Sequence, residues 1–151
     1  MKVYLDVSCL NRPFDDQRQM RIRLEAEAVT LILEQCDRGD WEQVSAEIAR
    51  IEINAMPDAD RKARVQLLLP DEKAILTLTQ PVFERAASLG PLGFKPADAL
   101  HVAAAETLRA DVLLSCDDRL CRAARRRRGA LKVRVVNPLD WLKEIGHGAN
   151  P

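Results

Sequence analysis

Short apolar segments typical of β-strands alternate along this chain with longer helical segments, and this alternation constrains the fold most. Such alternation predicts a parallel sheet with helices on both faces. At 151 residues we expect one domain over residues 1–145 and a short tail at 146–151. The expected strands are residues 2–5, 41–44, 74–79, 111–115 and 131–136. The expected helices are residues 15–38, 45–55, a segment from about 58, 82–89, 95–111, 117–127 and a short one from 137.

Two of these helices have a predicted buried stripe. In the first long helix the apolar residues recur at helical spacing, which places them on one face. Ser45 is expected to cap the second helix. The stripes are Met20, Leu24, Ala28, Leu31 and Ile32 in the first helix, and Ile48, Ile51 and Ala55 in the second.

Composition excludes several classes of protein. The 23 basic and 23 acidic residues balance, so the chain is not a strongly basic nucleic-acid binder, although local basic surface is still expected. It has no apolar run long enough to span a membrane, and it begins with a strand pattern rather than a signal peptide, so we expect a cytoplasmic protein. Four scattered cysteines and two histidines indicate neither a zinc site, a disulfide framework nor a pair of catalytic histidines.

Acidic residues fall where an α/β sheet usually binds its ligand, beyond the carboxyl ends of the strands. Asp6 follows the first strand, and Asp117 and Asp118 follow the strand at 111–115. Asp98 lies in the first turn of an alanine-rich helix, and Glu52 neighbours an apolar stripe. No cation occurs in the same local patterns, so we expect a hard divalent ion, Mg²⁺ or Mn²⁺ rather than zinc. Such an ion indicates phosphate-ester chemistry.

Each acid also has a purely structural interpretation. Asp6 could end a strand in a turn, Asp98 could favour a helix dipole, and Asp117 or Asp118 could cap a helix. Two phosphotransfer classes fit poorly, because Ser8 stands where an aspartyl-phosphate enzyme needs a second acid and because a receiver domain has its acidic pair early. No glycine-rich nucleotide loop occurs.

Four segments in this order resemble the PIN-domain nucleases, over about residues 3–141. They are YLDVSCLN near the start, SAEIARIEI at 45–53, ADALHVAAA at 97–105 and LLSCDDRL at 113–120. The resemblance implies a three-layer α/β/α fold with a central, mostly parallel sheet, a pocket for Mg²⁺ or Mn²⁺, and metal-dependent hydrolysis of RNA. VapC-like members are toxins of bacterial toxin–antitoxin pairs, so a small antitoxin partner is implied. Homodimers are frequent in the family, but no segment here requires one.

Matched by position, the family's four acids are Asp6, Glu52, Asp98 and Asp117. Three of these (Asp6, Asp98 and Asp117) are expected to bind one metal ion, while Glu52 holds a second ion or orients the attacking water. The hydroxyls of Ser8 and Ser115 match residues that support the acids, and Val7 replaces a frequent threonine or serine. Asp118 is an extra carboxylate, which we assign first to helix capping or early-helix charge and second to metal binding.

One dense basic run has two interpretations. It is either a solvated helix end or a contact for the RNA backbone. It consists of Arg122, Arg125, Arg126, Arg127 and Arg128. His101 is expected to be packed or hydrogen-bonded rather than a ligand, and Trp41 and Trp141 are expected in the core or an interface. The predicted function is an Mg²⁺- or Mn²⁺-dependent endoribonuclease and toxin. The alternative is a catalytically reduced PIN-like module that binds RNA or protein.

Overall fold

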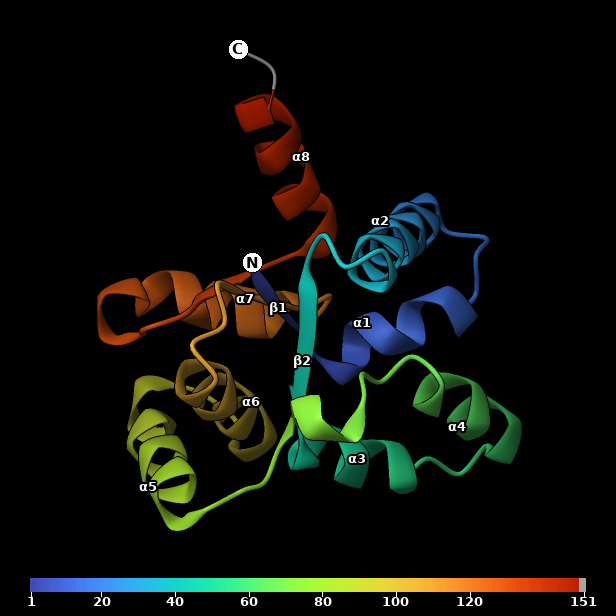
Figure 1. Cartoon of the computed structure of the whole chain (residues 1–151). Helices are drawn as coiled ribbons and strands as arrows, with labels where there is room; N and C mark the ends of the chain where they lie inside the picture. Colours follow the sequence, from blue (N-terminus) through green and yellow to red (C-terminus); the bar gives the residue numbers. More distant parts are fainter. Residues whose placement is uncertain (150–151) are drawn as a thin grey trace.

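A five-stranded parallel sheet forms the centre of the computed structural model, which describes residues 1–149 (Figure 1). The strand order is β3-β2-β1-β4-β5, and all four pairings are parallel. The strands are β1 (Lys2–Leu5), β2 (Glu42–Ala46), β3 (Ile75–Leu76), β4 (Val112–Leu114) and β5 (Arg134–Val136). The predicted parallel sheet is therefore confirmed, and it is parallel throughout rather than mostly so.

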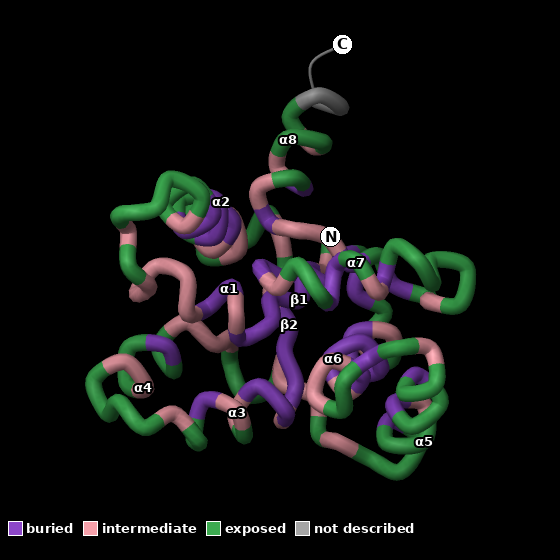
Figure 2. The backbone as a smooth tube through the Cα atoms, turned by 180° about the vertical axis from the view of Figure 1, so that it is seen from behind, coloured by how far each residue is buried: buried purple, intermediate pink, exposed green. Residues whose placement is uncertain are grey.

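Helices cover both faces of this sheet, which confirms the predicted three-layer α/β/α architecture (Figures 1 and 2). One face carries α5 (Gln80–Leu89), α6 (Pro96–Thr107) and α7 (Asp118–Arg126). The other carries α1 (Val7–Asn11), α2 (Met20–Asp37), α3 (Glu47–Asn54), α4 (Ala59–Gln66) and α8 (Pro138–Ala149). Short 3₁₀ helices connect them: η1 (Arg12–Phe14), η2 (Glu72–Ala74), η3 (Gly90–Leu92) and η4 (Arg128–Ala130).

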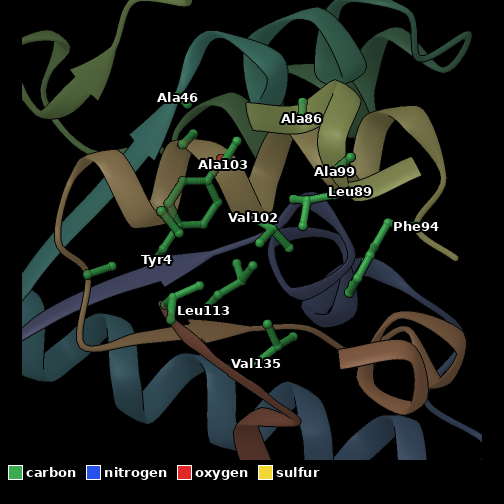
Figure 3. Packing of buried hydrophobic residues seen from close by; sticks show 14 of the residues in the cluster. Tyr4, Ala46, Ala86, Leu89, Phe94, Ala99, Val102, Ala103, Leu113 and Val135 are labelled. Atoms are coloured by element: carbon green, nitrogen blue, oxygen red, sulfur yellow. The ribbon is translucent and has the colours of Figure 1, made fainter. Parts of the chain in front are cut away.

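The apolar core is split by the sheet into two layers, because successive strand residues point to opposite faces. On β1, Tyr4 packs with the α5–α6–α7 layer, whereas Val3 and Leu5 pack with the other layer. Figure 3 shows the first layer, in which Val102 of α6 lies over Leu113 of β4 and close to Tyr4. Burial on both faces explains why the strands are short apolar runs without polar alternation.

The segment after β1 differs from the prediction. No helix was expected between the strand at 2–5 and the helix at 15–38, but the chain enters α1 directly and continues into η1. The Asp6 side chain caps α1 by accepting a hydrogen bond from the backbone N–H of Cys9 at 3.2 Å. A five-residue helix is too short to show a helical period, so the sequence pattern missed it. As a result, α2 begins at Met20 rather than near Asp15.

Several strand and helix boundaries from β2 onwards also differ from the prediction. Ser45 was expected to cap a helix, but it is a buried residue of β2, and Ala46 precedes α3 without a side-chain cap. The strand expected at 74–79 is reduced to β3, and the strand expected at 131–136 begins only at Arg134. The 3₁₀ turn η4 delays the start of β5.

The predicted buried stripes are partly wrong. On α2, Met20 is 63% exposed and Leu31 is 53% exposed, and on α3 Ile51 is 57% exposed. Ala28 and Ile32 are buried as predicted, but the buried face of α2 also includes Val29 and a charged residue, Glu25. Helical spacing alone could not identify that face, because Glu25 is buried only through contacts with distant residues.

Glu25 joins three parts of the chain. Its carboxylate is 1% exposed and accepts hydrogen bonds from Nε of Arg12 at 2.9 Å and Nε of Arg21 at 3.3 Å. The side-chain amide of Asn137, which precedes α8, donates a third. A buried carboxylate is tolerated when cations and donors satisfy it. This group therefore fixes η1 and α8 against α2.

The end of the chain packs through a pair of indoles. The rings of Trp41 and Trp141 lie 4.9 Å apart between centroids, as expected for core residues, and hold α8 beside the end of α2. Asn137 caps α8 by accepting a hydrogen bond from the N–H of Leu139 at 2.8 Å. Because α8 runs to Ala149, most of the predicted tail is helical, and Asn150 and Pro151 lie outside the described residues.

Replacing Glu25 should strongly destabilise the fold. We expect Glu25→Ala to lower the free energy of unfolding by about 3 kcal/mol, because it leaves Nε of Arg12 and the side-chain amide of Asn137 without their acceptor. Glu27→Ala, an exposed position on the same helix, should change it by less than about 0.5 kcal/mol. Urea unfolding of both variants measures the difference, and equal stabilities would contradict this role of Glu25.

Candidate active site

The candidate active site lies at the edge of the sheet where β1 and β4 end. The two strands pair in register up to Leu5 and Leu114, and the N–H of Asp6 donates to the carbonyl of Leu114 at 3.1 Å. The first residues after the strands, Asp6 and Ser115, therefore lie side by side although 109 positions separate them in the sequence. This is the edge at which parallel α/β sheets bind ligands.

Asp6 is buried and held by hydrogen bonds. It is 4% exposed and accepts hydrogen bonds from the hydroxyl of Ser8 and the N–H of Cys9. Burial raises the pKa of Asp6, while the nearby His101 and hydrogen bonds from Ser115, Ser8 and Cys9 oppose the rise. Burial therefore disfavours the charged form of this carboxylate more than the hydrogen-bond donors and His101 favour it.

The two predicted supporting serines connect both strand ends. The Ser8 hydroxyl lies 3.4 Å from the Ser115 hydroxyl and accepts a hydrogen bond from the N–H of Cys116 at 3.0 Å. Ser115 in turn accepts from the N–H of Asp117 at 3.0 Å. These bonds tie α1 to the segment after β4, so they fix the relative positions of Asp6 and Asp117.

Asp117 and Asp118 have different surroundings. Asp117 caps α7, since its Oδ1 accepts from the N–H groups of Arg119 at 2.9 Å and Leu120 at 3.4 Å. Capping by Asp118 was therefore a wrong prediction, although Asp118 does lie in the first turn of α7. Both oxygens of Asp118 bond to Arg21 of α2, and this pairing lowers the pKa of Asp118.

Asp98 shows that the acids influence one another. It lies in the first turn of α6, where burial, followed by the charges of Asp117 and Asp6, raises its pKa to about 6. Glu52 adds to the rise, and His101 opposes it. The structure thus brings together all four acids predicted from sequence, from four separate elements.

Glu52 is held by a hydrogen-bonded chain that sequence reasoning only partly anticipated. Its Oε1 bonds to Nε2 of His101 on α6, and Nδ1 of the same ring lies 2.7 Å from the hydroxyl of Tyr4. The expectation that His101 is hydrogen-bonded is confirmed. Tyr4 was missed, although its position two residues before Asp6, on the same face of β1, is a signal that could have identified it.

The donor chemistry of this site fits a hard divalent cation. All four acids offer oxygen ligands, and their mutual repulsion would be relieved by positive charge. Among residues 1–149, no three side chains already converge as a metal-binding cluster. The acids are instead held individually by the hydrogen bonds described above, close enough to affect one another's protonation.

Two openings are lined by residues that neighbour the acids: Asp118 lines the first and Ser8 the second. A groove of about 350 Å³ is lined by Arg122, Arg125 and Arg128 of α7 and η4, together with β5 and α8. The other two predicted arginines differ, because Nε of Arg127 bonds to the carbonyl of Leu92 and Arg126 does not line the groove. A second cleft, of about 430 Å³, is lined by Ser8, Asn11, Arg12, Arg61 and Met56 among others.

The raised pKa of Asp98 predicts a pH-dependent effect on stability. With metal ions chelated, Asp98→Asn should unfold at a higher temperature than the wild type at pH 7. The native state binds this proton more tightly than the unfolded chain, whose aspartate has a pKa near 3.8, so native stability falls as pH rises from about 4 to 6. Thermal unfolding in EDTA measures the difference in unfolding temperature between Asp98→Asn and the wild type, which should vanish towards pH 4.

Asp40→Asn, at an exposed loop position, is the control for the pH series. It should show the same pH dependence as the wild type. A stability difference between Asp98→Asn and the wild type that stays constant across this pH range would contradict the assigned coupling.

Comparison with known families agrees with this geometry. A model of the PIN domain matches residues 3–126, which include β1 to α7 and all four acids. No curated protein matches the chain. Domains of this family are generally nucleases and typically use divalent metal ions. With its parallel three-layer fold and the acids at the carboxyl edge of the sheet, the chain belongs to the PIN-domain family.

Proposed function

We propose that this protein is an endoribonuclease that depends on Mg²⁺ or Mn²⁺ and acts as the toxin of a toxin–antitoxin pair. The observation that carries the proposal is the convergence of Asp6, Asp98, Asp117 and Glu52, where burial and then the charges of the neighbouring acids raise the pKa of Asp98 to about 6. Carboxylates that are brought together although their ionisation becomes less favourable are typical of functional sites. The complete set of acids favours an enzyme over a catalytically reduced binding module.

The orientation of two acids supports their role as ligands. Hydrogen bonds within the protein engage Oδ1 of Asp117 and Oε1 of Glu52. Each side chain is thereby fixed through one oxygen, which leaves the other oxygen for the pocket. Asp6, Asp98 and Asp117 would hold the ion, and Glu52 would hold a second ion or orient the attacking water. A bound divalent cation would neutralise the carboxylates and stabilise negative charge on the scissile phosphate.

The arginines of α7 supply a route for the RNA backbone. Arg122 and Arg125 of α7 and Arg128 of η4 line one groove together with Asp118, which directly follows the helix cap Asp117. Guanidinium groups along such a groove suit successive phosphates. The cleft beside Ser8 would receive the strand on the other side of the scissile phosphate.

A small antitoxin is the partner we propose, acting in the cytoplasm, with homodimerisation as a further assembly. None of the helices in residues 1–149 has the length and apolar character needed to cross a bilayer. The antitoxin would suppress activity by covering the acidic pocket or the arginine groove.

Removing single pocket acids should abolish cleavage. We expect Asp6→Asn, Asp98→Asn and Asp117→Asn each to reduce Mg²⁺- or Mn²⁺-dependent cleavage of RNA by at least about 100-fold, because each removes a ligand charge. Excess EDTA should abolish wild-type cleavage. Denaturing gel electrophoresis of a labelled RNA measures the products, and growth of cells expressing each variant gives a second readout.

Asp118→Asn is the matched control, since Asp118 neighbours Asp117 but bonds to Arg21 outside the pocket. It should cleave at nearly the wild-type rate and still arrest growth. Undiminished cleavage by the three pocket variants, or by the wild type in excess EDTA, would refute the proposed mechanism.

Charge reversal in the groove should weaken RNA binding. We expect Arg122→Glu, Arg125→Glu and Arg128→Glu, combined in one protein, to lower affinity and to flatten its salt dependence. The slope of log affinity against log salt should fall by about 0.7 for each phosphate group that the protein no longer neutralises. Fluorescence anisotropy with single-stranded RNA in EDTA measures binding without cleavage. Arg126→Glu is the control, and an equal effect from it would argue against the groove.

A further inference from the structure

A buried hydrogen-bonded chain reaches from the central strand to the active-site glutamate. The hydroxyl of Tyr4 on β1 lies 2.7 Å from Nδ1 of His101 on α6, and Nε2 of that ring bonds to Oε1 of Glu52 on α3. Tyr4 is fully buried and His101 is 2% exposed, whereas the Glu52 side chain is 36% exposed. The chain therefore runs from the core to an acid that opens to solvent.

The hydrogen-bond geometry fixes which atoms carry the protons. If Nδ1 of His101 donated to Tyr4, the buried phenol would need another acceptor for its own proton, and the described residues offer none. If the phenol donates to Nδ1, the Tyr4 hydroxyl and both ring nitrogens of His101 are satisfied, and Nε2–H is left to donate to Glu52.

The same elements carry the other acids of the site. Tyr4 precedes Asp6 by two residues on β1, and His101 follows Asp98 by three residues on α6, so each pair lies on one face of its element. The chain thus ties Glu52, on a helix of eight residues, to the two elements that position Asp6 and Asp98. A glutamate side chain without such a contact would be free to change rotamer at the mouth of the site.

We propose that Tyr4 and His101 are positioning residues, which hold Glu52 in one orientation so that its second oxygen faces the metal or the attacking water. This inference rests on the proposed nuclease function. Neither residue touches the substrate in this arrangement. Their role is to fix the direction of a carboxylate, as residues behind metal ligands commonly do.

The kinetic test removes one donor at a time. Tyr4→Phe keeps the buried ring and should lower kcat for RNA cleavage about 10-fold with little change in KM. His101→Leu should lower kcat by at least as much, and His101→Gln should recover part of the loss because its amide can donate to Glu52. Unchanged kcat in both Tyr4→Phe and His101→Leu would overturn the inference.

Ser45→Ala is the matched control for loss of a buried hydroxyl. Ser45 lies on β2 beside β1, and its hydroxyl has no hydrogen-bond partner among the described residues. The substitution should leave kcat unchanged. A loss of kcat in Ser45→Ala equal to that in Tyr4→Phe would show that any change to the sheet core slows cleavage, which would also overturn the inference.

A second measurement does not depend on activity. Long-range ¹H–¹⁵N spectra at pH 8 distinguish the protonated from the unprotonated imidazole nitrogen, and His147→Gln leaves His101 as the sole histidine. We expect a single Nε2–H tautomer, which Tyr4→Phe converts to a mixture. An Nδ1–H tautomer or a mixture in the unsubstituted chain would refute the proton assignment. If the wild type fails to cleave RNA but shows the Nε2–H tautomer, the proposed function fails and the chain of hydrogen bonds stands.

Discussion

Parallel pairing of β1 with β2 and β4 is the constraint on which the rest of the structure depends. Because all strands run the same way, their carboxyl ends share one edge, and the residues that follow them meet there. Asp6 and Asp117 thereby become neighbours although they are distant in sequence. The parallel sheet also requires helices on both faces, which leaves this edge as the place where polar residues reach solvent.

Two kinds of acidic residue in this protein differ in whether cationic side chains of the protein neutralise them. Glu25 is neutralised within the protein by Arg12 and Arg21, so its role is to hold elements together. The pocket acids accept hydrogen bonds from hydroxyl, N–H and imidazole groups, with no arginine side chain among their partners in residues 1–149, and burial followed by the charges of the neighbouring acids raises the pKa of Asp98. An acid paired inside the protein stabilises the fold, whereas acids left to repel one another are suited to binding a cation.

Sequence patterns predicted the site better than they predicted the packing. Asp6, Asp98 and Asp117 lie at strand ends and helix starts and Glu52 lies within a helix, all as predicted, since these positions follow from local order along the chain. The buried face of α2 was predicted only in part, and Asp118 is a first-turn charge of α7 rather than its cap, which is Asp117. Burial of Glu25 depends on Arg12 and Asn137, and the choice between Asp117 and Asp118 as cap depends on the direction in which the chain leaves β4.

The sequence by itself determined the layered parallel architecture, the family and the four acids, because periodicity, strand ends and motif spacing are local properties. Only the tertiary structure decided which neighbours each acid has: Arg21 for Asp118, the start of α7 for Asp117, and the His101–Tyr4 pair for Glu52. Hydrogen bonds and charge interactions act over a few ångströms in space. Their partners are therefore set by how distant segments pack, which no single stretch of sequence specifies.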